Sequence, residues 1–277
     1  MYLRPTDLSA ALTALKGRPC TVLAGGTDFY PARVGRPLPD AILDITSLAV
    51  LRGVREEEAG WRIGALTTWS EVLATPLPSV FDGLKRAACE IGGRQIQNAA
   101  TLAGNICNAS PAADGIPALL ALEAEVELSA HDGVRRLPLA SFVAGSRRTA
   151  LRPEELLTAI LIPRWGESAR STFLKLGARR YLVISIVMVA ATVDAGADGR
   201  VARAAVAVGA CSEVSQRLTR LEGRLLGKPL EPALADLVRA DDVAALTPIS
   251  DIRGSAEYRR DAALTLVRRA LAELGRE

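Results

Sequence analysis

The sequence has few of the residues that metal centres and catalytic triads require. Its 277 residues include one histidine, His131, and four cysteines, with no C-x-x-C spacing among them. Scattered cysteines disfavour a disulfide framework, and a zinc or iron–sulfur site built from this chain alone is less expected still. His131 stands in a His-Asp-Gly turn, which we interpret as solvated. The protein is therefore expected to take its reactive chemistry from a cofactor.

Aromatic residues and excess charge are also scarce. Aromatics make up 4% of the sequence, and 34 basic residues against 31 acidic ones give a net charge of +3. No basic run is interleaved with aromatic side chains that could stack on bases, so we expect no nucleic-acid binding. The core must be built mainly from alanine, leucine, valine and isoleucine.

Long hydrophobic runs are missing too. The longest, residues 181–193, falls short of the roughly 20 residues that span a bilayer, so we expect no membrane span. Its β-branched residues predict a buried strand over 182–193. The first eight residues contain no apolar stretch typical of a signal peptide, and we expect a cytoplasmic protein.

The length and a hydrophobic share of 49% suit two domains. The chain begins with a helix over 8–17, which has Thr6 or Asp7 as its N-cap, and continues with strands over 20–24 and 41–45, so this β–α–β beginning fits an α/β unit. Beyond residue 167 the order becomes strands and then helices, which predicts a separate α+β domain. The expected strands are 171–176, 182–193 and 201–211, and the expected helical segments are 216–226 and 258–274.

The last helical segment is amphipathic. Its apolar residues can pack on the C-terminal sheet, and its arginines are expected to face solvent or an acidic partner. The apolar set is Tyr258, Leu264, Leu266, Val267 and Leu271, and the basic set is Arg259, Arg260, Arg268 and Arg269.

Two glycine-containing segments carry the functional signal. In Leu23-Ala-Gly-Gly-Thr-Asp28, two glycines after a strand permit positive φ, so that successive amides can converge on an anion. Alone, this segment also fits an ordinary tight turn. Thr101-Leu-Ala-Gly-Asn105, followed by the polar stretch 108–114, again offers a glycine turn with hydroxyl and amide donors. The two loops together could hold the two phosphates of a dinucleotide.

Standard nucleotide signatures are absent. There is no G-x-G-x-x-G, and residues 223–229 are one residue short of a P-loop and end in proline. The sequence therefore predicts a dinucleotide site made of two separate glycine loops.

With these motifs the sequence resembles the FAD-binding medium subunits of the molybdenum hydroxylases, the family of xanthine dehydrogenase, aldehyde oxidase and carbon monoxide dehydrogenase. Residues 23–28 are similar to the first flavin loop of the family, and 94–105 with 110–114 to the second. Similarity at 149–163, 173–176 and 251–260 extends over essentially the whole chain. The resemblance implies an α+β fold: a PCMH-type FAD-binding domain of two α/β subdomains at 1–167, and a C-terminal domain with a small antiparallel sheet and helices at 168–277.

The resemblance also implies which residues hold FAD. Backbone amides of the two loops would cradle the pyrophosphate, and Asp114 would hydrogen-bond the flavin half. Leu157 would pack by the isoalloxazine, and Lys175 would be the catalytic cation near its polar edge, stabilising the reduced ring. Ile91, at a position where relatives can carry an aromatic residue, would make only a dispersion contact with the cofactor. The implied cofactor-binding set is Val22, Leu23, Ala24, Gly25, Gly26, Thr27, Asp28, Phe29, Ile91, Thr101, Leu102, Ala103, Gly104, Asn105, Asp114, Leu157 and Lys175.

Two departures from the family pattern stand out. Ala103 replaces the first of two glycines common in the second loop, which restricts the approach of that backbone to a phosphate. The aromatic residue that stacks on the flavin after the lysine is not obvious, because Tyr181, Leu182 or Val183 could occupy its place.

The implied function is electron transfer. FAD on this chain would receive electrons from [2Fe–2S] clusters on a small partner subunit and pass them to an external acceptor, while a large partner subunit holds the molybdopterin cofactor. We expect a heterotrimer, dimerised, with no metal on this chain. One alternative is an autonomous FAD oxidase of the vanillyl-alcohol-oxidase type. A second is a scaffold without flavin, which Ala103 alone favours.

Overall fold

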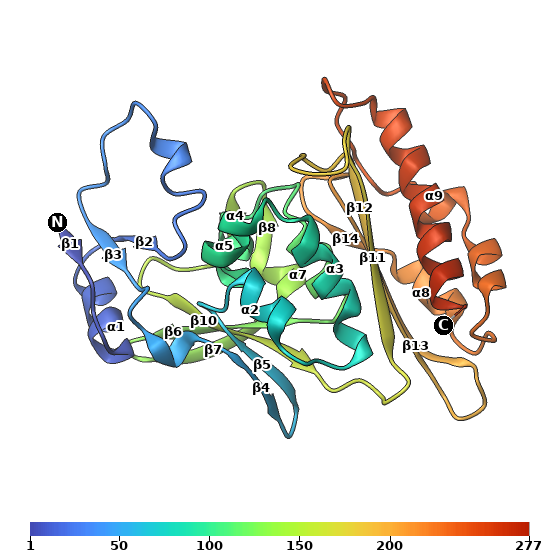
Figure 1. Cartoon of the computed structure of the whole chain (residues 1–277), viewed down its shortest axis with the longest axis horizontal. Helices are drawn as coiled ribbons and strands as arrows, with labels where there is room; N and C mark the ends of the chain where they lie inside the picture. Colours follow the sequence, from blue (N-terminus) through green and yellow to red (C-terminus); the bar gives the residue numbers. More distant parts are fainter. Residues whose placement is uncertain (277) are drawn as a thin grey trace.

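The computed structural model describes residues 1–276, in which three larger sheets lie side by side and a fourth sheet has only two strands (Figure 1). The first is a small parallel sheet in the order β1-β3-β2, made of β1 (Tyr2–Leu3), β2 (Thr21–Leu23) and β3 (Ile42–Asp44). Helix α1 (Leu8–Gly17) connects β1 to β2, and the side chain of Asp7 accepts from the Ala10 amide at its N-cap. The predicted helix over 8–17 and the predicted strands over 20–24 and 41–45 are confirmed, whereas strand β1, which completes the β–α–β unit, is not among the predicted elements.

The second sheet has five antiparallel strands in the order β4-β5-β10-β6-β7. Two hairpins, one of which turns at His131, pair with the long strand β10 between them. The strands are β4 (Val54–Glu57), β5 (Gly60–Gly64), β6 (Glu125–Ala130), β7 (Gly133–Pro138) and β10 (Leu156–Pro163), and a separate small ribbon joins β8 (Val143–Gly145) to β9 (Arg148–Thr149).

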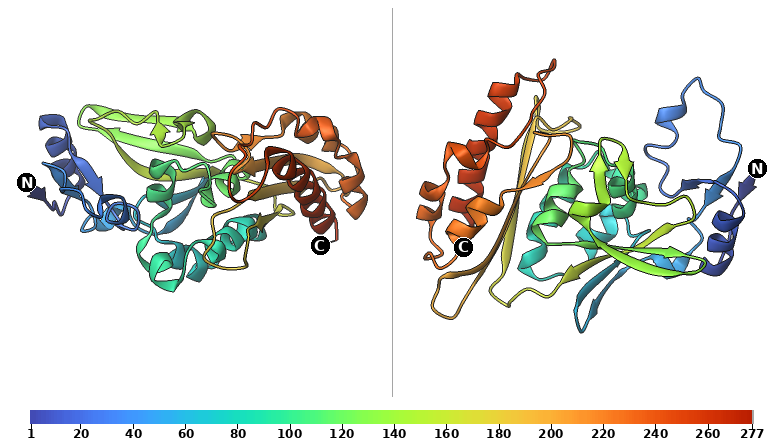
Figure 2. Two further views of the ribbon diagram at one scale, coloured as in Figure 1. Left: turned by 90° about the horizontal axis from the view of Figure 1, so that it is seen from above. Right: turned by 180° about the vertical axis from the view of Figure 1, so that it is seen from behind.

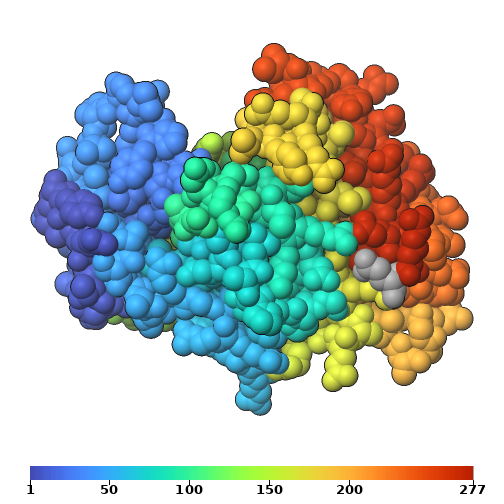
Figure 3. Space-filling model, viewed as in Figure 1, coloured from blue at the N-terminus to red at the C-terminus, as the bar shows by residue number. Residues whose placement is uncertain are grey.

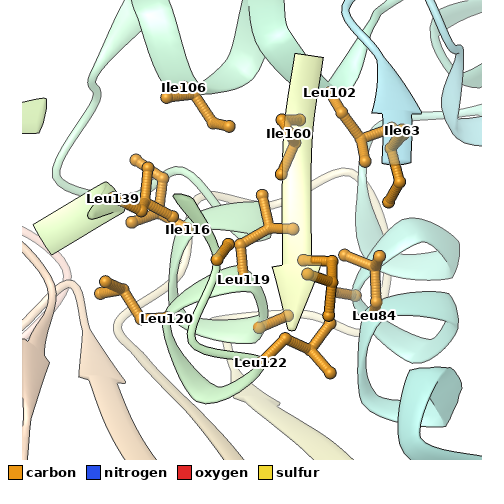
Figure 4. Close-up of a cluster of buried hydrophobic side chains, with 14 of the residues drawn as sticks. Ile63, Leu84, Leu102, Ile106, Ile116, Leu119, Leu120, Leu122, Leu139 and Ile160 are labelled. Carbon is orange, nitrogen blue, oxygen red and sulfur yellow. The ribbon is translucent and has the colours of Figure 1, made fainter. Parts of the chain in front are cut away.

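Short helices gather beside this sheet and form the main core. Their buried side chains are almost all aliphatic, and in Figure 4 Ile106, Ile116, Leu119 and Ile160 lie together in this cluster. The helices are α2 (Trp69–Ala74), α3 (Asp82–Glu90), α4 (Arg94–Ala99), α5 (Leu102–Asn108), α6 (Gly115–Ala121) and α7 (Leu139–Phe142). Single 3-10 turns cover Pro31–Arg33, Ala49–Leu51, Ser79–Phe81, Pro232–Leu237 and Ala240–Asp242.

The third sheet is antiparallel and separates two layers of helices. Helices α3 and α6 pack on one face of it, and the long helix α9 covers the other (Figure 2). Its elements are β11 (Arg170–Leu176), β12 (Val187–Ala195), β13 (Val201–Gly209), β14 (Gln216–Arg217), α8 (Thr219–Leu225) and α9 (Ala256–Leu274). The expected α+β fold is confirmed.

Three expectations about local structure need correction. Residues 94–105 are predicted to belong to the second glycine loop, but they contain helix α4 and the start of helix α5. The strand expected from 182 begins only at Val187, because Leu182 has a left-handed φ of 51° that no continuous strand accommodates. The segment expected to be helical from 216 begins with the short strand β14.

The arginines of α9 do not all face outward. Arg268 and Arg269 are exposed as expected, but Arg259 is only 3% exposed. Its guanidinium donates to the Ile186 carbonyl and to the Asp251 carboxylate, both at 2.7 Å. The expectation of a solvated arginine is therefore wrong at this position, because buried acceptors satisfy the charge. None of the helices in residues 1–276 combines the length and apolar character that crossing a membrane requires.

Candidate functional site

A cavity of about 390 Å³ lies where the parallel sheet meets helices α4 and α5 and strand β10. Figure 3 shows this N-terminal part, in blue, directly against the green helices. The cavity brings together the two predicted glycine segments and the two predicted ring-packing residues, which are far apart in sequence. From the predicted set it is lined by Val22, Ala24, Gly25, Gly26, Thr27, Asp28, Phe29, Ile91, Thr101, Ala103, Gly104, Asn105 and Leu157.

The first loop depends on its two glycines for different reasons. Gly26 has a φ of 74°, as expected, and a Cβ there would also lie 2.7 Å from the ring of Tyr30. Gly25 does not have a positive φ. A Cβ on Gly25 would lie 1.9 Å from the carbonyl oxygen of Ala99, so this glycine lets the loop press against the end of α4. The loop continues into the 3-10 turn Pro31–Arg33 rather than into an α-helix.

The amides of this loop are free. Within residues 1–276, the backbone N–H groups of residues 25–29 donate to no carbonyl or side chain. These residues are partly or fully exposed, so their amides are open to water or to an acceptor that enters the cavity. Such runs form concave sites for phosphate groups, which offer several acceptor oxygens.

The second segment forms the start of α5 rather than a loop. Thr101 is the N-cap, and its hydroxyl accepts from the Gly104 amide at 3.0 Å. The Leu102 amide donates to the Thr67 carbonyl, and the Asn105 amide donates to the Thr101 carbonyl. The Ala103 amide has no acceptor among the described residues, so it is the one from Leu102 to Asn105 that remains free for a phosphate.

Part of the cavity lining is apolar. Ile91 lies directly after α3 and is partly exposed to the cavity. Leu157 is 2% exposed and lies on β10 beside an irregularity in its pairing with β6. These side chains offer dispersion contacts and exclusion of water, which suit a flat heteroaromatic ring.

Asp114 and Lys175 lie outside the cavity lining and bind each other. Lys175 Nζ is 2.7 Å from Asp114 Oδ2, and the two side chains are 5% and 10% exposed. Lys175 Nζ also donates to the Glu90 carbonyl, next to Ile91, and the Ser185 hydroxyl donates to Asp114. Burial raises the pKa of Asp114 above its ordinary value, and the Lys175 ammonium opposes that rise. The predicted contact of these residues with FAD stays a prediction.

The remaining residues predicted to contact FAD do not line the cavity. Leu23 and Leu102 are buried in the cores and do not line the cavity. Of the three residues considered for ring stacking, Tyr181 is 62% exposed and Leu182 is also exposed. Val183 is half-buried against Gly177. None of the three lines the cavity.

Sequence reasoning missed several lining residues. Arg33, Trp69, Ile96 and Cys107 all line the cavity. Arg33 is the cation among the described lining residues, and its guanidinium lies 3.9 Å from the centre of the Phe29 ring. Burial raises the pKa of the Cys107 thiol to about 12, so it stays protonated near neutral pH. The capping signature Thr68-x-x-Glu71 predicts a helix start but not the inward position of Trp69.

The lining fits a dinucleotide that carries a flat ring. The free amides of residues 25–29 suit a pyrophosphate, and the apolar surface of Ile91 and Leu157 suits an isoalloxazine.

Comparison with known proteins agrees with this geometry. Residues 1–165 match the family described as "FAD binding domain in molybdopterin dehydrogenase", and residues 172–274 match "CO dehydrogenase flavoprotein C-terminal domain". The glyceraldehyde dehydrogenase medium chain of Sulfolobus acidocaldarius is 32% identical over 99% of this chain and 97% of that one. The nicotinate dehydrogenase FAD-subunit of Eubacterium barkeri is 33% identical over 83% of this chain and 80% of its own.

A solved structure gives the same result. A chain of the reconstituted CO dehydrogenase from Oligotropha carboxidovorans superposes with a TM-score of 0.88 at 26% identity, over 99% of this chain and 96% of that one. The resemblance noted in the sequence is confirmed. The chain belongs to the family of FAD-binding domains of molybdopterin dehydrogenases.

Proposed function

We propose that this chain binds FAD in the cavity and serves as the electron-transfer subunit of a molybdenum-containing hydroxylase. The observation that carries the proposal is the free run of amides at residues 25–29, which shares one cavity with the apolar surface of Ile91 and Leu157. Bound FAD supplies a ring that takes up electrons and passes them to an external acceptor.

The residues of the chain have distinct tasks in this proposal. The amides of residues 25–29, with that of Ala103, bind the pyrophosphate, and Gly25 and Gly26 allow their approach. Ile91 and Leu157 exclude water from the ring. Lys175 places a positive charge behind Ile91, where it favours a reduced, anionic ring. Asp114 holds that charge in position.

The partners follow from the relatives, whose names describe subunits and medium chains of larger enzymes. We propose a small subunit with [2Fe–2S] clusters and a large subunit with molybdopterin, joined with this chain in a dimer of heterotrimers in the cytoplasm. We also propose a boundary between residues 167 and 168, separating the FAD-binding and C-terminal domains. An autonomous oxidase of the vanillyl-alcohol-oxidase type is less well supported, because none of these relatives is described as a complete enzyme.

Purification of the chain with its native partners tests the proposal. We expect one FAD per chain with absorbance near 450 nm, together with iron, labile sulfide and molybdenum in the complex. The isolated chain is expected to oxidise no substrate. A complex without flavin would support the scaffold alternative, and turnover by the isolated chain would support the oxidase alternative.

A further inference from the structure

Two charged side chains line the cavity in the part of the chain that the structure describes, Asp28 and Arg33. Asp28 is exposed, whereas Arg33 is half-buried. The other lining residues are neutral. An anionic group in this cavity is therefore subject to one carboxylate and one guanidinium, besides the free amides of residues 25–29.

The backbone holds Arg33 close to these amides. Arg33 is the last residue of the 3-10 turn Pro31–Arg33. The Tyr30 amide donates to the Gly26 carbonyl at 3.1 Å, so the chain winds directly from the first loop into this turn. The position of the arginine is thus set by the same segment that presents the amides.

The guanidinium packs on this segment too. Its Nη1 donates to the Phe29 carbonyl at 2.8 Å, and its central carbon lies 3.9 Å from the centre of the Phe29 ring. A guanidinium carries five N–H donors, and within residues 1–276 those of Arg33 have no acceptor other than that carbonyl. Most of its donors therefore remain for water or for a ligand.

A pyrophosphate in this cavity needs a positive charge. The group is anionic, whereas backbone amides are neutral dipoles. The Asp28 carboxylate in the same lining repels an anion, and Arg33 is the described lining residue whose charge opposes that repulsion. The planar fork of a guanidinium also matches two oxygens of one phosphate, which the single point charge of an ammonium does not.

We propose that Arg33 binds the pyrophosphate of the cofactor through its guanidinium and supplies the positive charge that the free amides lack. The inference rests on the proposed binding of FAD. It adds to that binding a charged residue that the family resemblance does not imply. The amides of residues 25–29 bind the phosphates as dipoles, and Arg33 binds them as a charge.

The first test is the affinity of the flavin-free chain for FAD at low salt, measured by quenching of flavin fluorescence. Arg33→Gln keeps a polar side chain and removes the charge, and we expect FAD binding to weaken about tenfold or more. Arg36→Gln is the matched control, because it removes the same charge at an exposed position outside the lining. Equal affinity of the two variants would overturn the proposal. Failure of the unmodified chain to bind FAD would overturn the proposed function instead.

Salt distinguishes charge from packing. If Arg33 acts through its charge, FAD binding to the unmodified chain and to Arg36→Gln weakens as NaCl rises, and binding to Arg33→Gln weakens much less. Arg33→Lys keeps the charge without the fork, so it should keep the salt dependence at an intermediate affinity. A salt dependence of Arg33→Gln as steep as that of the unmodified chain would show that Arg33 acts through its contact with Phe29, and the proposal would fail.

Thermal unfolding of the flavin-free variants shows whether the turn survives. We expect Arg33→Gln and Arg36→Gln to unfold at similar temperatures, because a guanidinium that water reaches contributes little to the stability of the fold. If Arg33→Gln unfolds at a clearly lower temperature and Arg33→Lys loses FAD as fully as Arg33→Gln does, the arginine stabilises the loop and does not bind the phosphate.

Discussion

Lys175 Nζ lies 2.7 Å from Asp114 Oδ2 in a place that water hardly reaches. The pair joins β11 of the third sheet to the start of α6, and so ties together segments that match two different families. Two buried charges stabilise a fold only when each remains paired, because an unpaired buried charge has lost its hydration without compensation. The ion pair is therefore structural whatever its relation to the flavin.

Lys175→Met should destabilise the chain by about 3 to 5 kcal/mol, because it leaves the Asp114 carboxylate buried without its cation. Urea unfolding at pH 7 measures this loss. Burial already raises the pKa of Asp114, so the folded state holds this proton more tightly than the unfolded state does. Stability then falls as the pH rises through the folded pKa, and the fall should be steeper in Lys175→Met.

Lys175→Met with Asp114→Asn is the control that removes both charges. It should recover part of the stability and abolish the extra dependence on pH. If the double variant is as unstable as Lys175→Met alone, the loss comes from packing rather than from an unpaired carboxylate.

The same lysine should influence the flavin. In the FAD-loaded chain, Lys175→Met removes the positive charge, and the flavin should become harder to reduce. A tenfold change in the equilibrium corresponds to about 1.4 kcal/mol. Redox titration at fixed pH measures the two-electron midpoint potential. An unchanged potential would show that Lys175 has no electrostatic role at the ring.

Gly26→Val should weaken FAD binding about tenfold or more, because valine at a φ of 74° is strained and its Cβ meets the Tyr30 ring. Gly35→Val is the control: Gly35 has a φ of 72°, but a Cβ there meets nothing within 4 Å. Both variants should lose stability through backbone strain, Gly26→Val more because of the Tyr30 contact, and only Gly26→Val should lose FAD. Full FAD affinity in Gly26→Val would show that this loop does not cradle the phosphate.

Local signals predicted a large part of this fold. Asp7 caps α1, the His131 turn joins β6 to β7, and Gly26 adopts a positive φ, because each depends on residues adjacent in the sequence. The loop predicted at 94–105 is helical instead, although its glycine and asparagine residues disfavour helices in isolation. The Thr101 cap and burial of Leu102 and Ile106 against the core outweigh that local preference.

Long-range contacts in the site could not be predicted. The sequence favoured a solvated Arg259, but its acceptors Ile186 and Asp251 come from other parts of the chain. Gly25 was expected to need a positive φ, whereas it is required by the close approach of Ala99, far along the sequence. The sequence does not predict that Trp69 belongs to the cavity lining, because that position depends on how α2 packs against the rest of the chain.

Glu127 should make the fold sensitive to acid. Hydrogen bonds from Arg62, the closer at 2.5 Å, hold its pKa at about 2, well below the ordinary 4.5. A carboxyl with a lowered folded pKa contributes stability that is present above pH 4.5 and lost as the pH falls toward 2. Because the arginine side chains reach water, screening limits this contribution to about 1 to 2 kcal/mol.

Glu127→Gln should therefore lower stability at pH 7 and flatten its decline between pH 4.5 and 2. Urea unfolding across this range measures the difference. Glu125→Gln, on the same strand, is the control that leaves the bonds of Arg62 intact. If the stability of Glu127→Gln falls between pH 4.5 and 2 as steeply as that of the unmodified chain, other carboxyl groups cause the acid sensitivity.

Ser171 should be the residue through which β11 stabilises the start of α3. Its hydroxyl accepts from the Gly83 amide at 2.8 Å and donates to the Val80 carbonyl at 2.6 Å, and the N-cap of α3 has no side-chain hydrogen bond of its own. Ser171→Ala leaves a buried amide without an acceptor and should cost about 1 to 3 kcal/mol in urea unfolding. Ser79→Ala, which loses one bond to the Ala169 carbonyl in a less buried place, should cost less. If both variants lose the same stability, the Ser171 cap contributes no more than an ordinary hydrogen bond. Apolar packing then holds α3 against the third sheet.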